Sequence, residues 1–213
     1  MMKIALIGAS GFVGSAILNE ALQRGHAVTA LVRNPDRVEK RAGVAAEKID
    51  VTDTKALGSA LAGHDVVISA FNGGWGDPKI YEKHLDGSRA IVAASKAAGV
   101  RLIVIGGAGS LYAPNGSQFV DSPHFPEAYR DGARAARDAL AELRGETGIE
   151  WSFLSPAAHL GPGKRTGKFR LGGDQPVLDA KGESHVSVED LAVAIVDEAE
   201  TPKHTGKRFT LGY

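Results

Sequence analysis

Three glycines near the start of the chain have the spacing Gly8-x-x-Gly11-x-x-Gly14, and the backbone of such a turn can bind an anionic ligand. They follow an apolar run, Lys3 to Ile7, that is typical of a buried parallel strand, and Phe12 opens a helical pattern. Such a turn gathers free N–H groups and the positive end of a helix dipole where a pyrophosphate can bind. Glycine also removes the Cβ that would hold a phosphate away. We predict a dinucleotide site, with an ordinary strand-to-helix turn as the alternative in a chain of 27 glycines.

The residue that follows the second predicted strand, Ala27 to Val32, bears on which dinucleotide is bound. It is Arg33. An acidic residue at this place binds the ribose 2′-hydroxyl of NAD, whereas arginine offers a planar cation for the 2′-phosphate of NADP and a face for stacking on adenine. Arg33 therefore favours NADP(H) over NAD(H) without excluding NAD(H). The alternative is a surface arginine that only contacts solvent.

Two aspartates follow the third predicted strand, which ends at Glu47 to Ile49. Asp50 stands at the carboxyl edge of that strand, where its carboxylate could accept a hydrogen bond from the adenine amino group. Asp53, or Thr52, is expected to cap the helix that ends at Gly63, because such side chains satisfy free N–H groups at helix starts. A capping role for both aspartates is the alternative.

Two later strands, Asp65 to Phe71 and Arg101 to Gly107, also run into small or polar residues. The carboxyl ends of parallel strands share one edge of a sheet, and open α/β sheets bind ligands there. We therefore expect both exits to lie beside the cofactor. The predicted cofactor-binding residues are Gly8, Ser10, Gly11, Phe12, Val13, Gly14, Arg33, Asp50, Val51, Ala70, Phe71, Asn72, Gly106 and Gly107.

Strand and helix patterns alternate along nearly the whole chain. Further helices are predicted at 80–98, 127–144 and 187–199, and further strands at 150–154 and 208–211. This alternation demands parallel strands joined by right-handed crossovers. We expect a single α/β domain over residues 1–213, with a doubly wound, mostly parallel sheet and helices on both faces. Residues 155–186 are expected to form a small loop region on the substrate side.

Two irregular segments follow the fifth and sixth strands. Residues 112–126 contain three prolines and an Asn-Gly pair, and residues 161–170, reached through the exit at 155–160, are rich in glycine and positive charge. Loops of this length are usually functional, so either could cover an active site. Lys164 and Arg165 could meet a phosphate of the acceptor, and a solvated basic surface loop is the alternative.

The composition excludes several classes of function. Lys plus Arg and Asp plus Glu both total 25, so no bulk field recruits nucleic acid or an anionic membrane. With no cysteine, the chain has no disulfide framework, thiolate zinc site or cysteine nucleophile. No apolar run reaches the roughly 18 residues of a membrane span. We expect a soluble, cytoplasmic protein that acts on a small molecule, with no metal and no direct nucleic-acid partner; the sequence does not define the oligomeric state.

The glycine motif, Arg33, Asp50 and the strand exit from Gly106 to Ser110 together resemble the atypical branch of the short-chain dehydrogenase/reductase superfamily. Within it, the chain looks closest to the small NAD(P)-binding proteins grouped as NADH-flavin reductases, akin to the biliverdin reductase B/flavin reductase and NmrA-like proteins. The similarity runs from Met2 to Tyr213. It implies a Rossmann-type NAD(P)-binding domain and an active-site serine at Ser110, which would orient the acceptor or the nicotinamide; a loop serine bonded to its own backbone is the alternative.

One departure from the superfamily bears directly on mechanism. Its usual catalytic pair is Tyr-x-x-x-Lys, in which lysine lowers the tyrosine pKa so that the phenol can exchange a proton with an alcohol or carbonyl. None of the four tyrosines here has a lysine at that spacing: Leu85, Gly116 and Ala133 stand four residues after Tyr81, Tyr112 and Tyr129, and Tyr213 is the last residue. Sugar-nucleotide epimerisation or dehydration therefore lacks its expected base and becomes the third interpretation.

A planar acceptor makes fewer demands on the protein. A flavin or quinone accepts hydride directly and can take its proton from water, so positioning supplies most of the catalysis. We expect an NADPH-dependent reductase of a flavin, a quinone or a similar planar molecule. His124 and Tyr129 are possible proton donors or acceptor contacts, with surface roles as the alternative. A non-catalytic NADP-binding redox sensor of the NmrA type is the rival interpretation.

Overall fold

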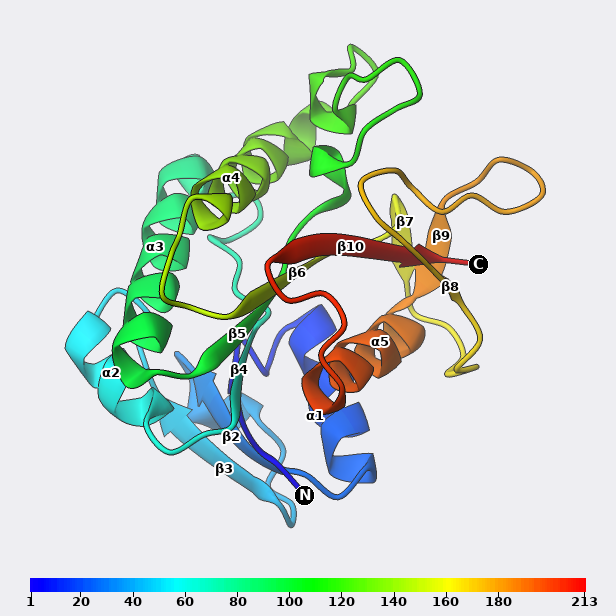
Figure 1. Ribbon diagram of the computed structural model, residues 1–213. Coiled ribbons are helices and arrows are strands. Elements are labelled where there is room, and N and C mark those ends of the chain that lie inside the picture. The colour runs from blue at the N-terminus through cyan, green and yellow to red at the C-terminus, as the bar shows by residue number, and fades with distance from the viewer.

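The apolar run before the glycines forms a central strand, and the other predicted strands assemble on either side of it (Figure 1). In this computed structural model, which describes residues 1–213, the sheet order is β3-β2-β1-β4-β5-β6-β10-β8, and only β8 is antiparallel to its neighbour. The strands of this sheet are β1 (Lys3–Ile7), β2 (Ala27–Val32), β3 (Val44–Lys48), β4 (Val66–Ser69), β5 (Arg101–Ile105), β6 (Trp151–Ser155), β8 (Arg170–Gly172) and β10 (Lys207–Gly212). The predicted fold class is confirmed.

The register aligns the carboxyl ends of the central strands. Ile7 of β1 pairs with Leu31 of β2 and with Ser69 of β4, and Ser69 pairs in turn with Val104 of β5. The strand order reverses between β1 and β4, so the glycine turn after β1 lies at the switch point of the sheet. The predicted strand exits therefore share one edge of the sheet.

Five helices cover the two faces of the sheet (Figure 1). They are α1 (Phe12–Gln23), α2 (Thr54–Leu61), α3 (Ile80–Ala98), α4 (Glu127–Arg144) and α5 (Val188–Glu200). Alternate residues of β1 enter different cores: Ile4 and Leu6 belong to a buried cluster with residues of α1 and α5, whereas Ala5 and Ile7 belong to one with residues of α2 and α3. This division explains why the central strands are apolar on both faces.

Two predicted helix starts have the expected capping geometry. The Asp53 carboxylate accepts a hydrogen bond from the Ala56 amide at 3.0 Å, so Asp53 and not Thr52 caps α2. The Ser187 hydroxyl accepts from the Asp190 amide at 3.0 Å and caps α5. None of the helices combines the length and apolar character needed to cross a bilayer.

Residues 155–186 are more regular than the sequence indicates. They contain β7 (His159–Gly161) and the edge strand β8, and β9 (His185–Ser187) begins at their end and pairs with β7 as a separate two-stranded parallel sheet. A strand of three residues is too short to show an alternating hydrophobic pattern. Its position depends instead on pairing with segments that are distant in the sequence. In the segment 112–126 the chain forms a short 3₁₀ helix, η3 (Phe119–Asp121), and an isolated bridge between Tyr112 and Gln118.

Candidate functional site

Two of the three motif glycines are required by the packing of the turn itself. Gly8 has a φ of +78°, and a Cβ there would lie 2.6 Å from the carbonyl oxygen of Ala70. A Cβ on Gly14 would lie 2.0 Å from the carbonyl oxygen of Gly8, so glycine lets α1 pack directly on the end of β1. These contacts bring the exits of β1 and β4 together, as predicted.

Gly11 differs, because the fold alone does not explain it. Its φ of −84° and ψ of 174° are extended values that any residue adopts. The one atom near an added Cβ is the carbonyl oxygen of Gly8, at 3.3 Å. The missing side chain instead leaves the space before α1 unobstructed, which is the property that a close phosphate contact requires.

The N-terminus of α1 carries unsatisfied donors. Gly11 is its N-cap residue and supplies no side-chain hydrogen bond, and the first turn contains no acidic residue. The amides of Phe12, Val13 and Gly14 have no partner, whereas the Ser15 amide donates to the Gly11 carbonyl at 2.8 Å. Three free N–H groups at the positive end of a helix dipole, beside a residue without a side chain, fit the pyrophosphate of a dinucleotide.

Arg33 and Asp50 lie at the ends of the neighbouring strands. Arg33 is exposed and forms no hydrogen bond or ion pair, so its guanidinium is free to bind a 2′-phosphate. Asp50 accepts from the amide of Thr52 at 3.0 Å and from its hydroxyl at 2.7 Å, and these two bonds, aided by the Arg33 charge, hold the pKa of Asp50 below its ordinary value. Val51 packs against the apolar cluster under α2 and α3.

The exits of β4 and β5 are shaped by local packing. The Phe71 ring stacks on His84 with 5.7 Å between centroids, and the side-chain oxygen Oδ1 of Asn72 accepts a hydrogen bond from the Gly74 amide at 2.8 Å. A Cβ on Gly106 would lie 2.0 Å from the Phe153 ring, so that glycine is a packing requirement. Gly107 has room, because the nearest atom to an added Cβ lies at 3.7 Å. The side chains of Phe71 and Asn72 thus have local partners, whereas Gly107 leaves open space at the exit of β5.

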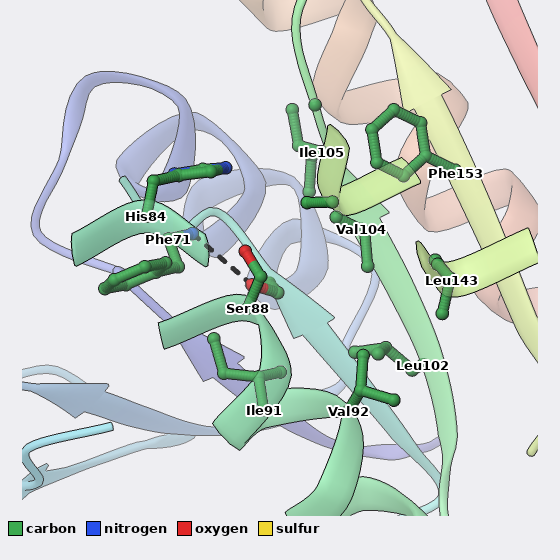
Figure 2. Close-up of a pocket in the computed structure, with 13 residues that line it drawn as sticks. Phe71, His84, Ser88, Ile91, Val92, Leu102, Val104, Ile105, Leu143 and Phe153 are labelled. Carbon is green, nitrogen blue, oxygen red and sulfur yellow. Dashed lines mark hydrogen bonds between the residues drawn. The ribbon is translucent and has the colours of Figure 1, made fainter. Parts of the chain in front are cut away.

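Beneath these exits lies a small apolar cavity lined by His84, Phe71 and Phe153 among others (Figure 2). Its volume of about 20 Å³ suits one water molecule, so it is no acceptor site. Burial lowers the pKa of His84 to about 4, and its Nδ1 has no partner. His84 is therefore a neutral residue of the core at neutral pH.

No hydrogen bond joins the three predicted catalytic residues to one another. Ser110 is only 1 % exposed, and its hydroxyl lies 3.2 Å from the Gly107 carbonyl oxygen and 3.1 Å from the Ser155 hydroxyl. His124 is exposed on the loop after η3. Tyr129 lies in the first turn of α4, with its side chain largely exposed. Their roles in the reaction stay predictions.

Sequence reasoning missed the side chain that holds Ser110. The Arg208 guanidinium, buried within β10, donates from Nη1 to the Ser110 carbonyl oxygen at 3.2 Å and lies 3.3 Å from its hydroxyl. Its Nε donates to the Asp174 carboxylate at 2.7 Å. The sequence did contain a signal for this contact: Arg208 stands within an apolar strand, and a buried cation needs a polar or charged partner. The Ser110 turn is thus fastened to β10 through Arg208 and to β6 through Ser155.

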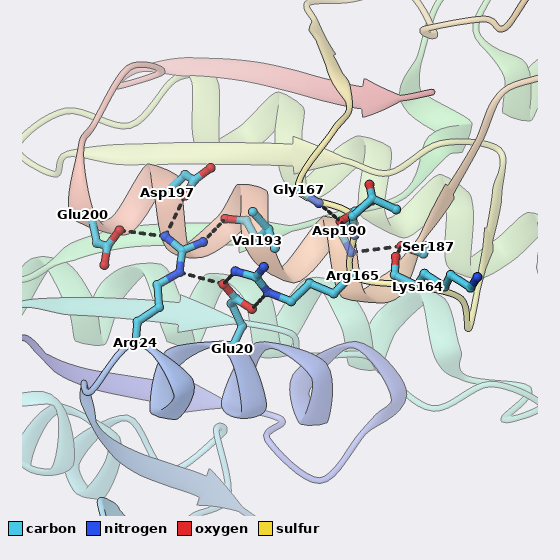
Figure 3. Close-up of polar contacts among 11 residues, drawn as sticks. Glu20, Arg24, Lys164, Arg165, Gly167, Ser187, Asp190, Val193, Asp197 and Glu200 are labelled. Atoms are coloured by element: carbon cyan, nitrogen blue, oxygen red, sulfur yellow. Dashed lines mark hydrogen bonds and ion pairs between the residues drawn. The ribbon is translucent and has the colours of Figure 1, made fainter.

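The basic loop is also held by carboxylates. Arg165 donates to Glu20 of α1 at 2.6 and 2.8 Å, and these bonds, together with those from Arg24, hold the Glu20 pKa below its ordinary value against the opposing effect of burial (Figure 3). Buried Asp190 accepts from the amides of Thr166 and Gly167, each at 2.8 Å. Arg165 therefore has a partner within the protein, whereas the Lys164 side chain forms no ion pair.

None of the tyrosine hydroxyls bonds a lysine. Tyr81 donates to Asp138 at 2.7 Å, and this bond raises the pKa of its phenol, opposite to the shift that a catalytic base needs. Tyr213 donates to Asp190 at 2.7 Å. The hydroxyls of Tyr112 and Tyr129 have no hydrogen-bond partner. The fold therefore creates no tyrosine–lysine pair out of residues distant in sequence.

Comparison with known families tests the cofactor assignment. The model of a family described as NAD(P)H-binding matches residues 8–202. The chain belongs to this NAD(P)H-binding family. The match begins at Gly8, the first residue of the glycine turn. Because the family is described as NAD(P)H-binding, the match supports the predicted nicotinamide cofactor.

Several proteins resemble the chain along its whole length. The uncharacterised protein YwnB of Bacillus subtilis is 41% identical over 99% of this chain and 98% of its own. A Bacteroides thetaiotaomicron structure, described as that of a proposed epimerase, is 46% identical with a TM-score of 0.92 and covers 100% of this chain and 97% of its own. A Streptococcus pneumoniae structure, for which an NADH-flavin reductase is proposed, is 35% identical with a TM-score of 0.88, covering 100% and 99%. These likenesses confirm the resemblance to the atypical reductase group.

Proposed function

We propose that this protein is an NADPH-dependent reductase that delivers hydride to a flavin, a quinone or a similar planar acceptor. The observation that carries the proposal is the hydrogen bonding of the tyrosines: two hydroxyls donate to carboxylates, and none forms a hydrogen bond with a lysine. Reactions that begin by removing a hydroxyl proton need such a pair, whereas reduction of a planar acceptor does not. The Streptococcus relative, described as a proposed NADH-flavin reductase, supports the same choice.

The residues suited to hold NADPH come from three strand exits. The free amides of Phe12, Val13 and Gly14 would bind the pyrophosphate. Arg33, which has no partner within the protein, would pair with the 2′-phosphate. Asp50 keeps one carboxylate oxygen free of hydrogen bonds, and that oxygen would accept from the adenine amino group.

The reaction balances without an acid from the protein. The bound nicotinamide supplies a hydride, which carries two electrons, and the acceptor takes one further proton from water. The chain would contribute position, because the exits of β4 and β5 present small residues such as Ala70 and Gly107 at the sheet edge. Placing two flat rings in contact converts a bimolecular step into an effectively unimolecular one.

The test mixes the purified protein with NADPH and, in turn, FMN, riboflavin and small quinones, while the loss of NADPH absorbance is followed. Turnover on at least one planar acceptor is expected. The matched control is Gly11→Ala, which removes the phosphate contact at a position that the fold tolerates. Tight NADPH binding without turnover on any acceptor would contradict the reductase and favour the redox sensor.

The epimerase description of the Bacteroides relative suggests a different reaction, which the same preparation can test. Sugar-nucleotide epimerisation starts with loss of a hydroxyl proton, and the raised pKa of Tyr81 keeps that phenol protonated, so that it is not available to accept the proton. Conversion of a nucleotide sugar by the protein with NADP⁺, detected by chromatography, would replace the reductase with the epimerase.

A further inference from the structure

Two large aromatic side chains are exposed together at the ligand edge of the sheet. Trp75, in the loop between β4 and α3, is 58 % exposed, and Tyr129, in the first turn of α4, is 54 % exposed. Their ring centroids lie 5.3 Å apart with the planes at 90°. An edge-to-face pair of this kind is favourable in itself, yet each ring leaves more than half of its surface uncovered.

The helix beneath the pair is shaped to receive the indole. A Cβ on Gly132 of α4 would lie 2.5 Å from Cζ3 of Trp75 and 2.9 Å from Cδ1 of Ile80. Glycine inside a helix weakens the helix relative to alanine, so this residue gives up helix stability to seat a ring that is still exposed. Such an arrangement is expected of a surface that contacts a ligand and is not explained by the needs of the core.

The pair also lies at the carboxyl ends of the strands, where open α/β sheets bind ligands. Trp75 is five residues beyond Ala70, whose carbonyl oxygen touches the glycine turn. Next to Gly132 on α4, Ala133 packs on Gly109, at the exit of β5, with 2.9 Å to an added Cβ. Trp75 and Tyr129 therefore flank the exits of β4 and β5.

The two halves of a dinucleotide lie on opposite sides of the switch point. Arg33 and Asp50, suited to the adenosine half, are on the side of β2 and β3. The nicotinamide half therefore belongs on the side of β4 and β5, next to the aromatic pair.

We propose that Trp75 and Tyr129 bind the ring system of the hydride acceptor, which is a flat, electron-poor aromatic molecule of the isoalloxazine or quinone class. The assignment rests on the proposed function for the identity of the acceptor, whereas the binding itself requires no turnover. Exposed indole and phenol rings bind such molecules by stacking, and this contact tolerates different acceptors because it needs no matched hydrogen bonds.

Tryptophan fluorescence gives a direct measure of this contact. The chain has two tryptophans, and Trp151 is buried at 5 % exposure. In a Trp151→Phe background Trp75 is the sole reporter, and riboflavin is expected to quench its emission in a saturable manner. Because quenching needs no hydride transfer, the measurement does not depend on activity.

The variants then assign the contact to the pair. Trp75→Ala and Tyr129→Ala, each at an exposed site, are expected to raise the dissociation constant for riboflavin at least tenfold, measured through the fluorescence of riboflavin itself. Trp75→Phe should recover most of the affinity. The dissociation constant for NADPH should change by less than about twofold in all three variants, because stacking and phosphate contacts are separate. Gly132→Ala, which displaces the indole, should weaken riboflavin binding as Trp75→Ala does.

Each outcome bears on one proposal. Saturable quenching of Trp75, together with a riboflavin affinity that Trp75→Ala and Tyr129→Ala lower and without turnover on any acceptor, would support the aromatic site and contradict the reductase. Turnover with unchanged KM and unchanged riboflavin affinity in both alanine variants would overturn the aromatic site and leave the reductase intact. If Trp75→Ala instead converts a dimer to a monomer in sedimentation experiments and leaves riboflavin binding unaltered, the pair is an interface between copies and the inference is wrong.

Discussion

Gly11→Ala and Gly14→Ala should separate the two reasons for glycine in one short turn. At Gly14 an added Cβ would lie 2.0 Å from the Gly8 carbonyl oxygen, and 2.7 Å from the carbonyl carbon, so the backbone of α1 or β1 must shift. At Gly11 the nearest atom lies 3.3 Å away and the backbone is extended, so alanine fits after a small adjustment. One variant is therefore expected to affect folding and the other to affect binding.

The magnitudes follow from these contacts. Overpacking of a backbone contact at Gly14 is expected to cost about 3 kcal/mol of unfolding free energy, near the upper end of the usual range for inserted methyl groups. At Gly11 the reduced freedom of the unfolded chain offsets the poorer N-cap, which leaves a change within about 1 kcal/mol. A methyl group there holds the pyrophosphate off the free amides. The loss of a charge-assisted hydrogen bond, about 1.5–3 kcal/mol, weakens NADPH binding by about 10- to 100-fold.

Urea unfolding, followed by circular dichroism, measures the first effect, and titration calorimetry with NADPH measures the second. Gly11→Ala should unfold near the wild-type midpoint and bind NADPH poorly, whereas Gly14→Ala should unfold at lower urea. Undiminished NADPH affinity in Gly11→Ala would show that no phosphate lies against this residue. Wild-type stability in Gly14→Ala would refute the packing argument.

Three further changes test other parts of the structure. Arg33→Ala should weaken NADPH binding about tenfold and NADH binding little in calorimetry, whereas Lys207→Ala, which removes the same charge at the exposed first residue of β10, should alter neither. For His84, the folded pKa of about 4 lies below its ordinary value of 6.5, so the unfolded chain takes up the proton first as pH falls. Stability should then drop by about 2 kcal/mol between pH 7 and pH 5, and His84→Phe should remove most of that dependence in urea titrations. Asp190→Asn, which weakens the acceptor of several hydrogen bonds, should lower the unfolding free energy by about 2 kcal/mol in the same assay.

Local patterns predicted the parts of the molecule that local physics decides. The strand that ends at Ile7 and the helix that starts at Phe12 are visible as hydrophobic periods, and Asp53 and Ser187 cap their helices through amides three residues away. The positions of Gly8 and Arg33 at adjacent strand exits follow from the topology of parallel sheets. The edge of the sheet that holds the site could therefore be predicted.

The partners of the site residues could not be predicted, because they lie far apart in sequence. Ser110 is fixed by Arg208, which is 98 residues away, and Arg165 is bound by Glu20 across 145 residues. Nothing in the local sequence of the basic loop indicates that its arginine already has a carboxylate partner. Strands β7 and β8 could not be predicted for the same reason, since three-residue segments become strands only by pairing with neighbours that the fold supplies.

The two carboxylates that hold the basic loop also determine what kind of element it is. Arg165 is tied to α1 through Glu20, while Thr166 and Gly167 are tied to α5 through Asp190. The segment has therefore lost most of its conformational entropy before any ligand arrives, and a ligand that touches it incurs little further ordering cost. A glycine-rich basic loop is usually regarded as a mobile lid. In this fold it is a preorganised segment, held between α1 and α5 by its carboxylate partners.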